Sequence, residues 1–154
     1  AIIAVDVNHD YDAAPNLGDK RPPPLKMGEG FTMTVGSIVS EPLNRVIEET
    51  ANEHDIPLQR DVAGRDTGTD GMAGVLAAVD CAATSIGFPI RNMHTISETG
   101  HTGDVRCAIE AITRSIRALD EQGVTPGTWP TDQPRLDRAE PLAHQGAPDK
   151  KEDE

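Results

Sequence analysis

The 154-residue sequence has little positive charge, few aromatic side chains and only two cysteines. Lys and Arg number 14 against 26 Asp and Glu, so nucleic-acid binding is disfavoured because no basic surface can neutralise phosphates. No apolar run approaches the roughly 18 residues of a membrane span, which disfavours a membrane protein. Cys81 and Cys107 lack CxxC spacing, and we expect free thiols in a reducing, cytoplasmic compartment.

The composition predicts adaptation to concentrated salt. Aromatics are 3% of the chain, only four of the basic residues are lysine, and the formal net charge is −12. Short carboxylates keep a surface hydrated in salt that screens their mutual repulsion. The alternative is an ordinary acidic protein with a disordered acidic tail. Because 18 of the acidic residues lie within residues 1–120, the sequence favours the halophilic interpretation.

Predicted strands and helices alternate along residues 1–123, which indicates an α/β layered fold with a mostly parallel central sheet and flanking helices. Ser40 is a predicted N-cap with Pro42 in the first turn, and Asp104 opens the clearest amphipathic helix, which ends before Gly123. We expect residues 124–154, which are acidic and rich in proline, to form a disordered tail without chemistry. The predicted strands are 2–7, 31–39, 56–62 and 83–88, and the predicted helices begin at 40, 71 and 104.

Polar clusters follow three of the predicted strands. Asp6 lies near the end of the first strand, 66–70 follow the third, and 91–98 follow the fourth and include His94. Ligands gather at the carboxyl ends of parallel strands, and Asp with His suits zinc or cobalt. Each residue also has a plain structural explanation, since Asp6 can face solvent and a lone histidine is usually structural. None of the histidines at positions 9, 54 and 101 has the HxxxH or HxxE spacing of a metal site.

Several segments, taken in order, resemble the C-terminal half of the glutamyl aminopeptidase family of dinuclear metallopeptidases, which includes the tetrahedral aminopeptidases. The resemblance covers about residues 1–121, and the stretch that ends in Arg91-Asn-Met-His94 is its most specific element. The matching segments are Val5-Asp6-Val7, Lys26-Met-Gly-Glu-Gly30, 51–59, Gly68-Thr69-Asp70, 86–94 with Glu98, and Asp104-Val105.

The resemblance implies a ligand set that this chain contains only in part. Asp6 would be a terminal ligand to one of two divalent ions, zinc or cobalt, and His94 a terminal ligand to the other. Thr69 and Asp70 would lie near the site, while Arg91 and Glu98 would support the ligands or the substrate. The family's other histidine, its bridging aspartate and its paired glutamates, one of them the general base, precede the matched region. We therefore expect no catalytic residue in this chain, which alone would be inactive and could be metal-free.

The function expected from the resemblance is that of a C-terminal fragment of an aminopeptidase that removes N-terminal residues from peptides. Its partners would be peptide substrates and either the missing N-terminal half or other subunits of a homo-oligomer. Ala1 opens directly into a predicted strand, which favours a piece of a longer protein. The alternative is a non-catalytic relative of the metallopeptidase fold that acts as a chaperone-like or protein-binding module.

Overall fold

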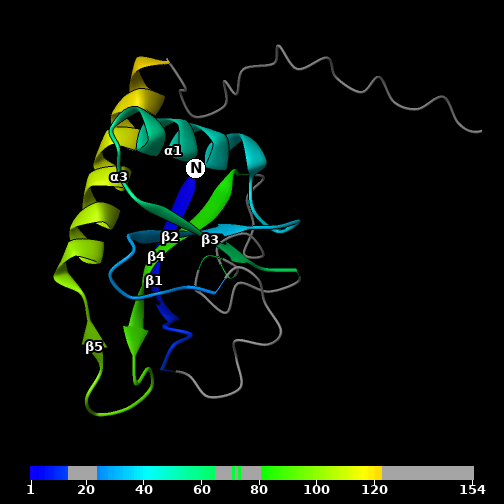
Figure 1. Ribbon diagram of the computed structural model, residues 1–154. Coiled ribbons are helices and arrows are strands. Elements are labelled where there is room, and N and C mark those ends of the chain that lie inside the picture. Colours follow the sequence, from blue (N-terminus) through cyan, green and yellow to red (C-terminus); the bar gives the residue numbers. More distant parts are fainter. Residues whose placement is uncertain (14–23, 65–70, 72, 74–80, 123–154) are drawn as a thin grey trace, which may run out of the picture. The chain divides into compact units, whose positions relative to one another are not determined.

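The computed structural model describes residues 1–13, 24–64, 71, 73 and 81–122, which form a sheet with two helices packed on it (Figure 1). Ala1–Gly123 group into one compact unit, and the tail predicted at 124–154 lies outside the described residues. No helix in these described ranges is long and apolar enough to cross a membrane. The strands are β1 Ile2–His9, β2 Phe31–Val35, β3 Leu58–Val62, β4 Ala83–Arg91 and β5 Thr99–Gly100, and the helices are α1 Glu41–Glu53 and α3 Thr102–Glu121.

The sheet has the strand order β1-β4-β2-β3, and the two-residue β5 pairs with β4. β1 runs parallel to β4, and β2 runs parallel to β3. Both β2 and β5 are antiparallel to β4. The predicted α/β fold is confirmed, with a sheet that is mixed rather than wholly parallel. β4 and β2 are the central strands and are buried along most of their length, because neighbouring strands cover both of their edges.

The core lies between the sheet and the two helices. Phe31 and Met33 of β2 and Ile86 of β4 have no exposed surface, and they pack with residues of α1 and α3. Thr32 and Thr34, which alternate with the two apolar residues of β2, are also buried. The helix residues in this cluster are Leu43, Ile47, Ala51, Ala108 and Ala111.

Helix α1 forms as the sequence predicts. The hydroxyl of Ser40 accepts a hydrogen bond from the Leu43 amide, and Pro42 occupies the first turn, where a missing N–H costs nothing. Leu43 and Ile47 then lie on the buried face. The helix is also tied to the sheet, because the Asn44 side chain donates to the carbonyl of Thr34 in β2 at 2.8 Å.

Helix α3 also forms where predicted, but its predicted apolar stripe is buried only in part, with Ile112 and Leu119 packed partly buried against the core. Ile109 is 61% exposed and Ile116 is 54% exposed, while Ala108, Ala111 and Ser115 are buried. Small side chains on the buried face let the helix approach β4, β2 and α1 closely, so packing distance, not hydropathy alone, selects the face.

Each of the four predicted strands differs from the structure at one boundary. β1 continues to His9 and β4 continues to Arg91, because the two strands pair in register along their whole length. β2 ends at Val35, not at 39, and Gly36 after it has φ +147°; β3 begins at Leu58, not at 56, and α3 begins at Thr102, not at 104. β5 was not predicted. Most of the helix predicted at 71–79 lies outside the described residues, although Gly71 and Ala73 are helical.

Candidate functional site

The carboxyl ends of β1 and β4 lie side by side, which places the segments that follow them at one edge of the sheet. In the parallel register, His9 is opposite Ile90, and the amide of Asp10 donates to the carbonyl of Ile90 at 2.9 Å. This is the edge at which ligands bind in open α/β sheets. It is therefore the natural place to look for a functional site.

An ion pair with one buried partner joins the two strand ends. Asp10 is 1% exposed, and its Oδ2 accepts a hydrogen bond from Nε of Arg91 at 2.6 Å. Its other oxygen accepts from the amide of Asp12 at 3.0 Å. Since a buried carboxylate is costly unless it is paired, this arrangement is a structural lock between the end of β1 and the start of the loop after β4.

The loop after β4 carries His94 on a sharply turned backbone. Asn92 and His94 both have positive φ, at 57° and 67°, and the Thr95 amide closes the turn by donating to the carbonyl of Asn92 at 3.1 Å. Oε1 of Glu98 accepts from the His94 amide at 2.7 Å. Within the described chain, the His94 ring has no hydrogen bond or ion pair, and the residue is exposed. The imidazole of His94 is therefore accessible to a ligand.

Asp6 lies within β1, opposite Gly87 of β4. Its Oδ1 accepts a hydrogen bond from the amide of Val7 at 2.8 Å, which orients the carboxylate. A Cβ on Gly87 would lie 2.8 Å from Oδ1 of Asn8 and 3.0 Å from Oγ1 of Thr32, so only glycine leaves room for this polar row. Asp6 and Asn8 alternate with His9 along the strand, and a regular strand directs their side chains to the opposite face.

A second group of polar contacts surrounds the loop at residues 26–30. Asp104 at the start of α3 is 1% exposed, and its two oxygens accept from the amides of Gly28 at 2.7 Å and Gly30 at 2.9 Å. The side chain of Gln59 bonds both the amide and the carbonyl of Lys26 and the carbonyl of Gly30. All of these polar groups are satisfied internally, which indicates a structural loop.

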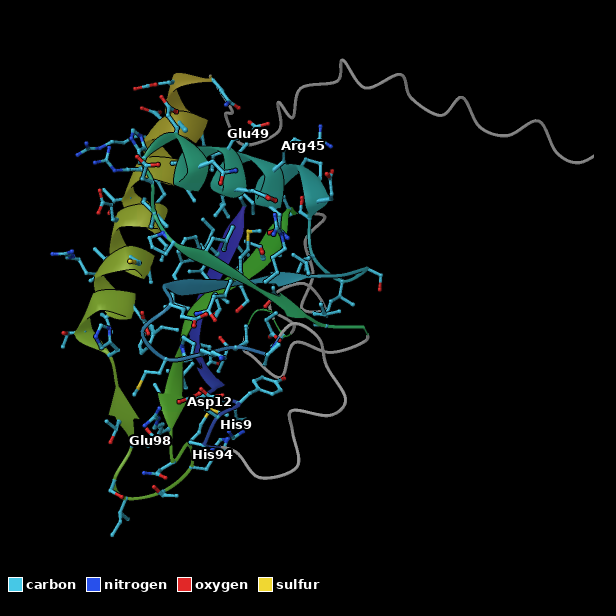
Figure 2. The ribbon with its side chains drawn as sticks, in the orientation of Figure 1. His9, Asp12, Arg45, Glu49, His94 and Glu98 are labelled. Atoms are coloured by element: carbon cyan, nitrogen blue, oxygen red, sulfur yellow. The ribbon has the colours of Figure 1, made fainter. Side chains whose placement is uncertain are left out.

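A hollow of about 280 Å³ lies between the end of β2 and the first turns of α1, and Arg45 is on its rim. Figure 2 shows Arg45 at the opposite end of the described structure from His94. The hydrogen bond and charge of Glu41 raise the pKa of the Arg45 guanidinium above its ordinary value. This hollow is separate from the strand ends where the predicted ligands lie.

The predicted site residues have different positions in the structure. Asp6 and His94 belong to adjacent strands and their loops, but no described contact joins them. Arg91 pairs with Asp10, and Glu98 holds the backbone of His94. The predicted residues Thr69 and Asp70 lie outside the described residues.

Sequence reasoning did not identify Asp10 or His9 as candidate residues, and it placed Asp104 at the start of a helix without predicting its contacts. Asp10 and Asp104 are buried carboxylates whose partners are distant in the chain. His9 lacks the spacing of a metal site in the sequence, yet its ring centroid lies 6.3 Å from that of His94. The signal that could have identified Asp10 is its position directly after a strand. For His9 no local signal exists.

The family model for M42 glutamyl aminopeptidases matches residues 1–110. The chain belongs to this family. It is 32% identical over 124 residues to the lysyl aminopeptidase of Pyrococcus furiosus, a match that covers 80% of this chain and 35% of the relative. The chain thus spans about a third of the length of that curated relative.

Solved structures agree with this assignment. The TET1 peptidase of Pyrococcus horikoshii, which assembles into a tetrahedron or a large octahedral shell, matches with a TM-score of 0.52 and 26% identity. That match covers 71% of this chain and 32% of the other. The TET aminopeptidase of the archaeon Thaumarchaeota archaeon SCGC AB-539-E09 has a TM-score of 0.63, 24% identity, and coverage of 78% and 33%. The latter likeness concerns the fold alone.

Membership of the family implies a divalent metal, and the described residues meet its requirements in part. The Asp6 carboxylate and the His94 imidazole are donor types that zinc and cobalt accept, and the His94 ring has no other described hydrogen-bonding partner. No group of three or more His, Cys, Asp or Glu side chains able to hold an ion occurs among the described residues. The donors therefore fit in kind, and a complete site requires more of them.

Proposed function

We propose that this chain is the C-terminal part of the catalytic domain of a divalent-metal aminopeptidase that removes N-terminal residues from peptides. Family membership carries the proposal, together with the chain's coverage of about a third of its curated relative. The adjacent placement of β1 and β4 supports it, because Asp6 lies within one of these strands and His94 lies in the turn after the other. The general base and the other ligands would come from the part of the enzyme that this chain does not contain.

Each candidate residue has a role that its contacts support. Asp6 would offer a carboxylate oxygen to one ion, with its orientation set by the Val7 amide. His94 would offer its imidazole to the second ion, on a turn that Glu98 holds. Arg91 would act through the Asp10 pair by fixing the base of that turn. When bound, zinc or cobalt supplies Lewis-acid polarisation of the scissile carbonyl.

The proposal extends to the partners of the complete protein. The related Pyrococcus horikoshii peptidase forms closed shells, and we extend homo-oligomeric assembly to the complete form of this protein. Peptides with a free N-terminus are the proposed substrates. Thr69 and Asp70 are proposed to lie near the bound peptide or the metals.

The test compares the 154-residue chain with the protein expressed from its complete reading frame, using a panel of aminoacyl-p-nitroanilides with added Co²⁺ or Zn²⁺. The complete protein should hydrolyse them, lose activity on chelation and regain it with metal. Asp6→Asn and His94→Gln should each lower kcat/KM more than about 100-fold, because each removes a ligand. His54→Gln is the matched control, since His54 lies at the end of α1 beside Arg114.

Two results would contradict the proposal. Turnover by the purified, monomeric 154-residue chain would show that it is no fragment of a larger active site. A complete protein that binds metal yet hydrolyses none of the panel would overturn the peptidase and favour the non-catalytic, protein-binding alternative.

A further inference from the structure

The two outer strands of the sheet differ in composition. Within the described residues, β1 and β3 stand at opposite ends of the strand order, and each has one neighbouring strand. β3 has the sequence Leu58-Gln-Arg-Asp-Val62, and its charged side chains are typical of an edge that must not pair with another strand. β1 begins instead with the apolar run Ile2-Ile-Ala-Val5. Such a run is typical of a strand in the interior of a sheet.

The backbone of β1 has hydrogen-bonding groups on both of its edges. The amide of Ile2 donates to the carbonyl of Ala82 at 2.8 Å, on the side of β4. Because alternate residues of a strand direct their backbone groups to opposite edges, the amides and carbonyls of Ile3 and Val5 face away from β4. No described strand pairs with this outer edge.

The two described helices leave part of the same strand uncovered. Val5 is in register with Ile86 of β4, so the two side chains lie on the same face of the sheet. Ile86 has no exposed surface and belongs to the core beneath α1 and α3, whereas Val5 is 59% exposed. An apolar side chain and outward-facing backbone groups therefore occur together on β1, as they do on a strand that has a further neighbour.

We infer that the outer edge of β1 is an interaction surface that pairs, through backbone hydrogen bonds, with a β-strand from the part of the complete protein that this chain does not contain. The inference rests on the proposed function, and the match that covers only 35% of the curated relative supports this occupant. The pairing involves Ile3 and Val5 and stops at Val7, whose amide already donates to Oδ1 of Asp6 at 2.8 Å. The added strand therefore lies beside the candidate ligand Asp6, where the missing ligands are needed.

The experiment measures amide hydrogen exchange by mass spectrometry with electron-transfer fragmentation, in the 154-residue chain and in the complete protein. The Val5 amide should exchange at least about 100-fold more slowly in the complete protein, because an amide bonded inside a sheet exchanges only when the strands separate. The Ala4 amide, which faces β4, should be protected in both forms. The Arg60 amide is the matched control, because Ala63 donates to Val35 of β2 and alternation then directs Arg60 to the outer edge of β3.

A matched pair of substitutions tests the same edge independently. Val5→Lys adds a charge to β1, and Val62→Lys adds one to β3, where Val62 is 46% exposed. Because both valines are exposed, each change should leave the melting temperature of the 154-residue chain within about 2 °C of wild type. In the complete protein, Val5→Lys should lower the melting temperature by more than about 5 °C, because the added strand then buries the charge, while Val62→Lys should not.

The outcomes separate this inference from the proposed function. Equal exchange of the Val5 amide in the two forms overturns the inference. Protection in the 154-residue chain that increases with protein concentration, together with a dimer in sedimentation, shows that a second copy occupies the edge and overturns it as well. Peptidase activity in a complete protein whose Val5 amide still exchanges rapidly overturns the inference alone. A protected Val5 amide in a complete protein that hydrolyses no peptide overturns the proposed function instead.

Discussion

Two loops of this chain use their polar groups in opposite ways. In the loop at 26–30, the amides of Gly28 and Gly30 are bound by the buried carboxylate of Asp104, and Gln59 bonds the amide and carbonyl of Lys26 and the carbonyl of Gly30. In the loop at 92–98, every residue except Met93 is exposed, and most of the described hydrogen bonds connect its own members.

The two loops therefore differ in role: the loop at 26–30 stabilises the fold, and the loop at 92–98 exposes a candidate ligand. The contacts of the loop at 26–30 with Asp104 and Gln59 fix the start of α3 against the sheet. The loop after β4 leaves the His94 ring accessible and relies on an anchor at its base, where Arg91 meets Asp10. Substitutions in the two loops should therefore affect different properties.

The largest effect is expected from Asp104→Ala. The change leaves the buried amide of Gly30 without an acceptor, at about 1–3 kcal/mol, and also removes the part-buried hydrogen bond to the amide of Gly28, so the free energy of unfolding should fall by about 3 kcal/mol. Asp104→Asn retains one acceptor oxygen and should cost less. Urea unfolding followed by circular dichroism measures both. Asp120→Ala, on the exposed end of α3, is the control. An equal loss of stability in the control would show that the hydrogen bonds of Asp104 to Gly28 and Gly30 do not stabilise the fold.

Arg91→Gln should have the next largest effect, because it leaves the buried Asp10 carboxylate without its cation. Breaking a fully buried pair costs 3–5 kcal/mol, and since the Arg91 side chain is 47% exposed we expect about 2 kcal/mol. The signals of the His9 and His94 rings should shift as well, since the lock between their strands is lost. Arg117→Gln on exposed α3 is the control. Unchanged ring signals would show that the ion pair does not position the loop.

Glu98→Ala should affect dynamics more than stability. The lost hydrogen bond to the His94 amide is exposed and is worth about 1 kcal/mol of local opening, which corresponds to about fivefold faster hydrogen exchange at that amide. Global unfolding should change by less than about 0.5 kcal/mol. Glu53→Ala at the end of α1 serves for comparison. If exchange at His94 keeps its wild-type rate, the turn is held by its backbone alone.

The smallest effect is expected from Ile96→Ala, because Ile96 is fully exposed at the tip of the loop. The free energy of unfolding should stay within about 0.5 kcal/mol of wild type. Ile86→Val in the core, which removes only one methylene, should cost about 1 kcal/mol by the same measurement. A loss at Ile96 that matches or exceeds the loss at Ile86 would mean that the exposed loop packs against something in solution.

Most of the elements and the family could be predicted from the residues alone. Ser40 and Pro42 predict the start of α1 because capping depends on neighbours within one turn. The resemblance to the glutamyl aminopeptidases rests on short segments in a fixed order, and the family assignment confirms it. Adaptation to salt and the roles of Asp6 and His94 stay predictions, since they depend on surfaces and ligands beyond what composition or spacing can reveal.

Contacts between groups that are distant in the chain follow from the folded structure. The buried face of α3 consists of small residues such as Ala111, because the distance of approach to the sheet depends on the helix and its neighbours together. The partners of Asp104 and the pairing of Asp10 with Arg91 are likewise separated by long stretches of chain. His9 lies beside His94 because two parallel strands end in register. Periodicity and spacing report on near neighbours only, so none of these contacts could be predicted before the strands were paired.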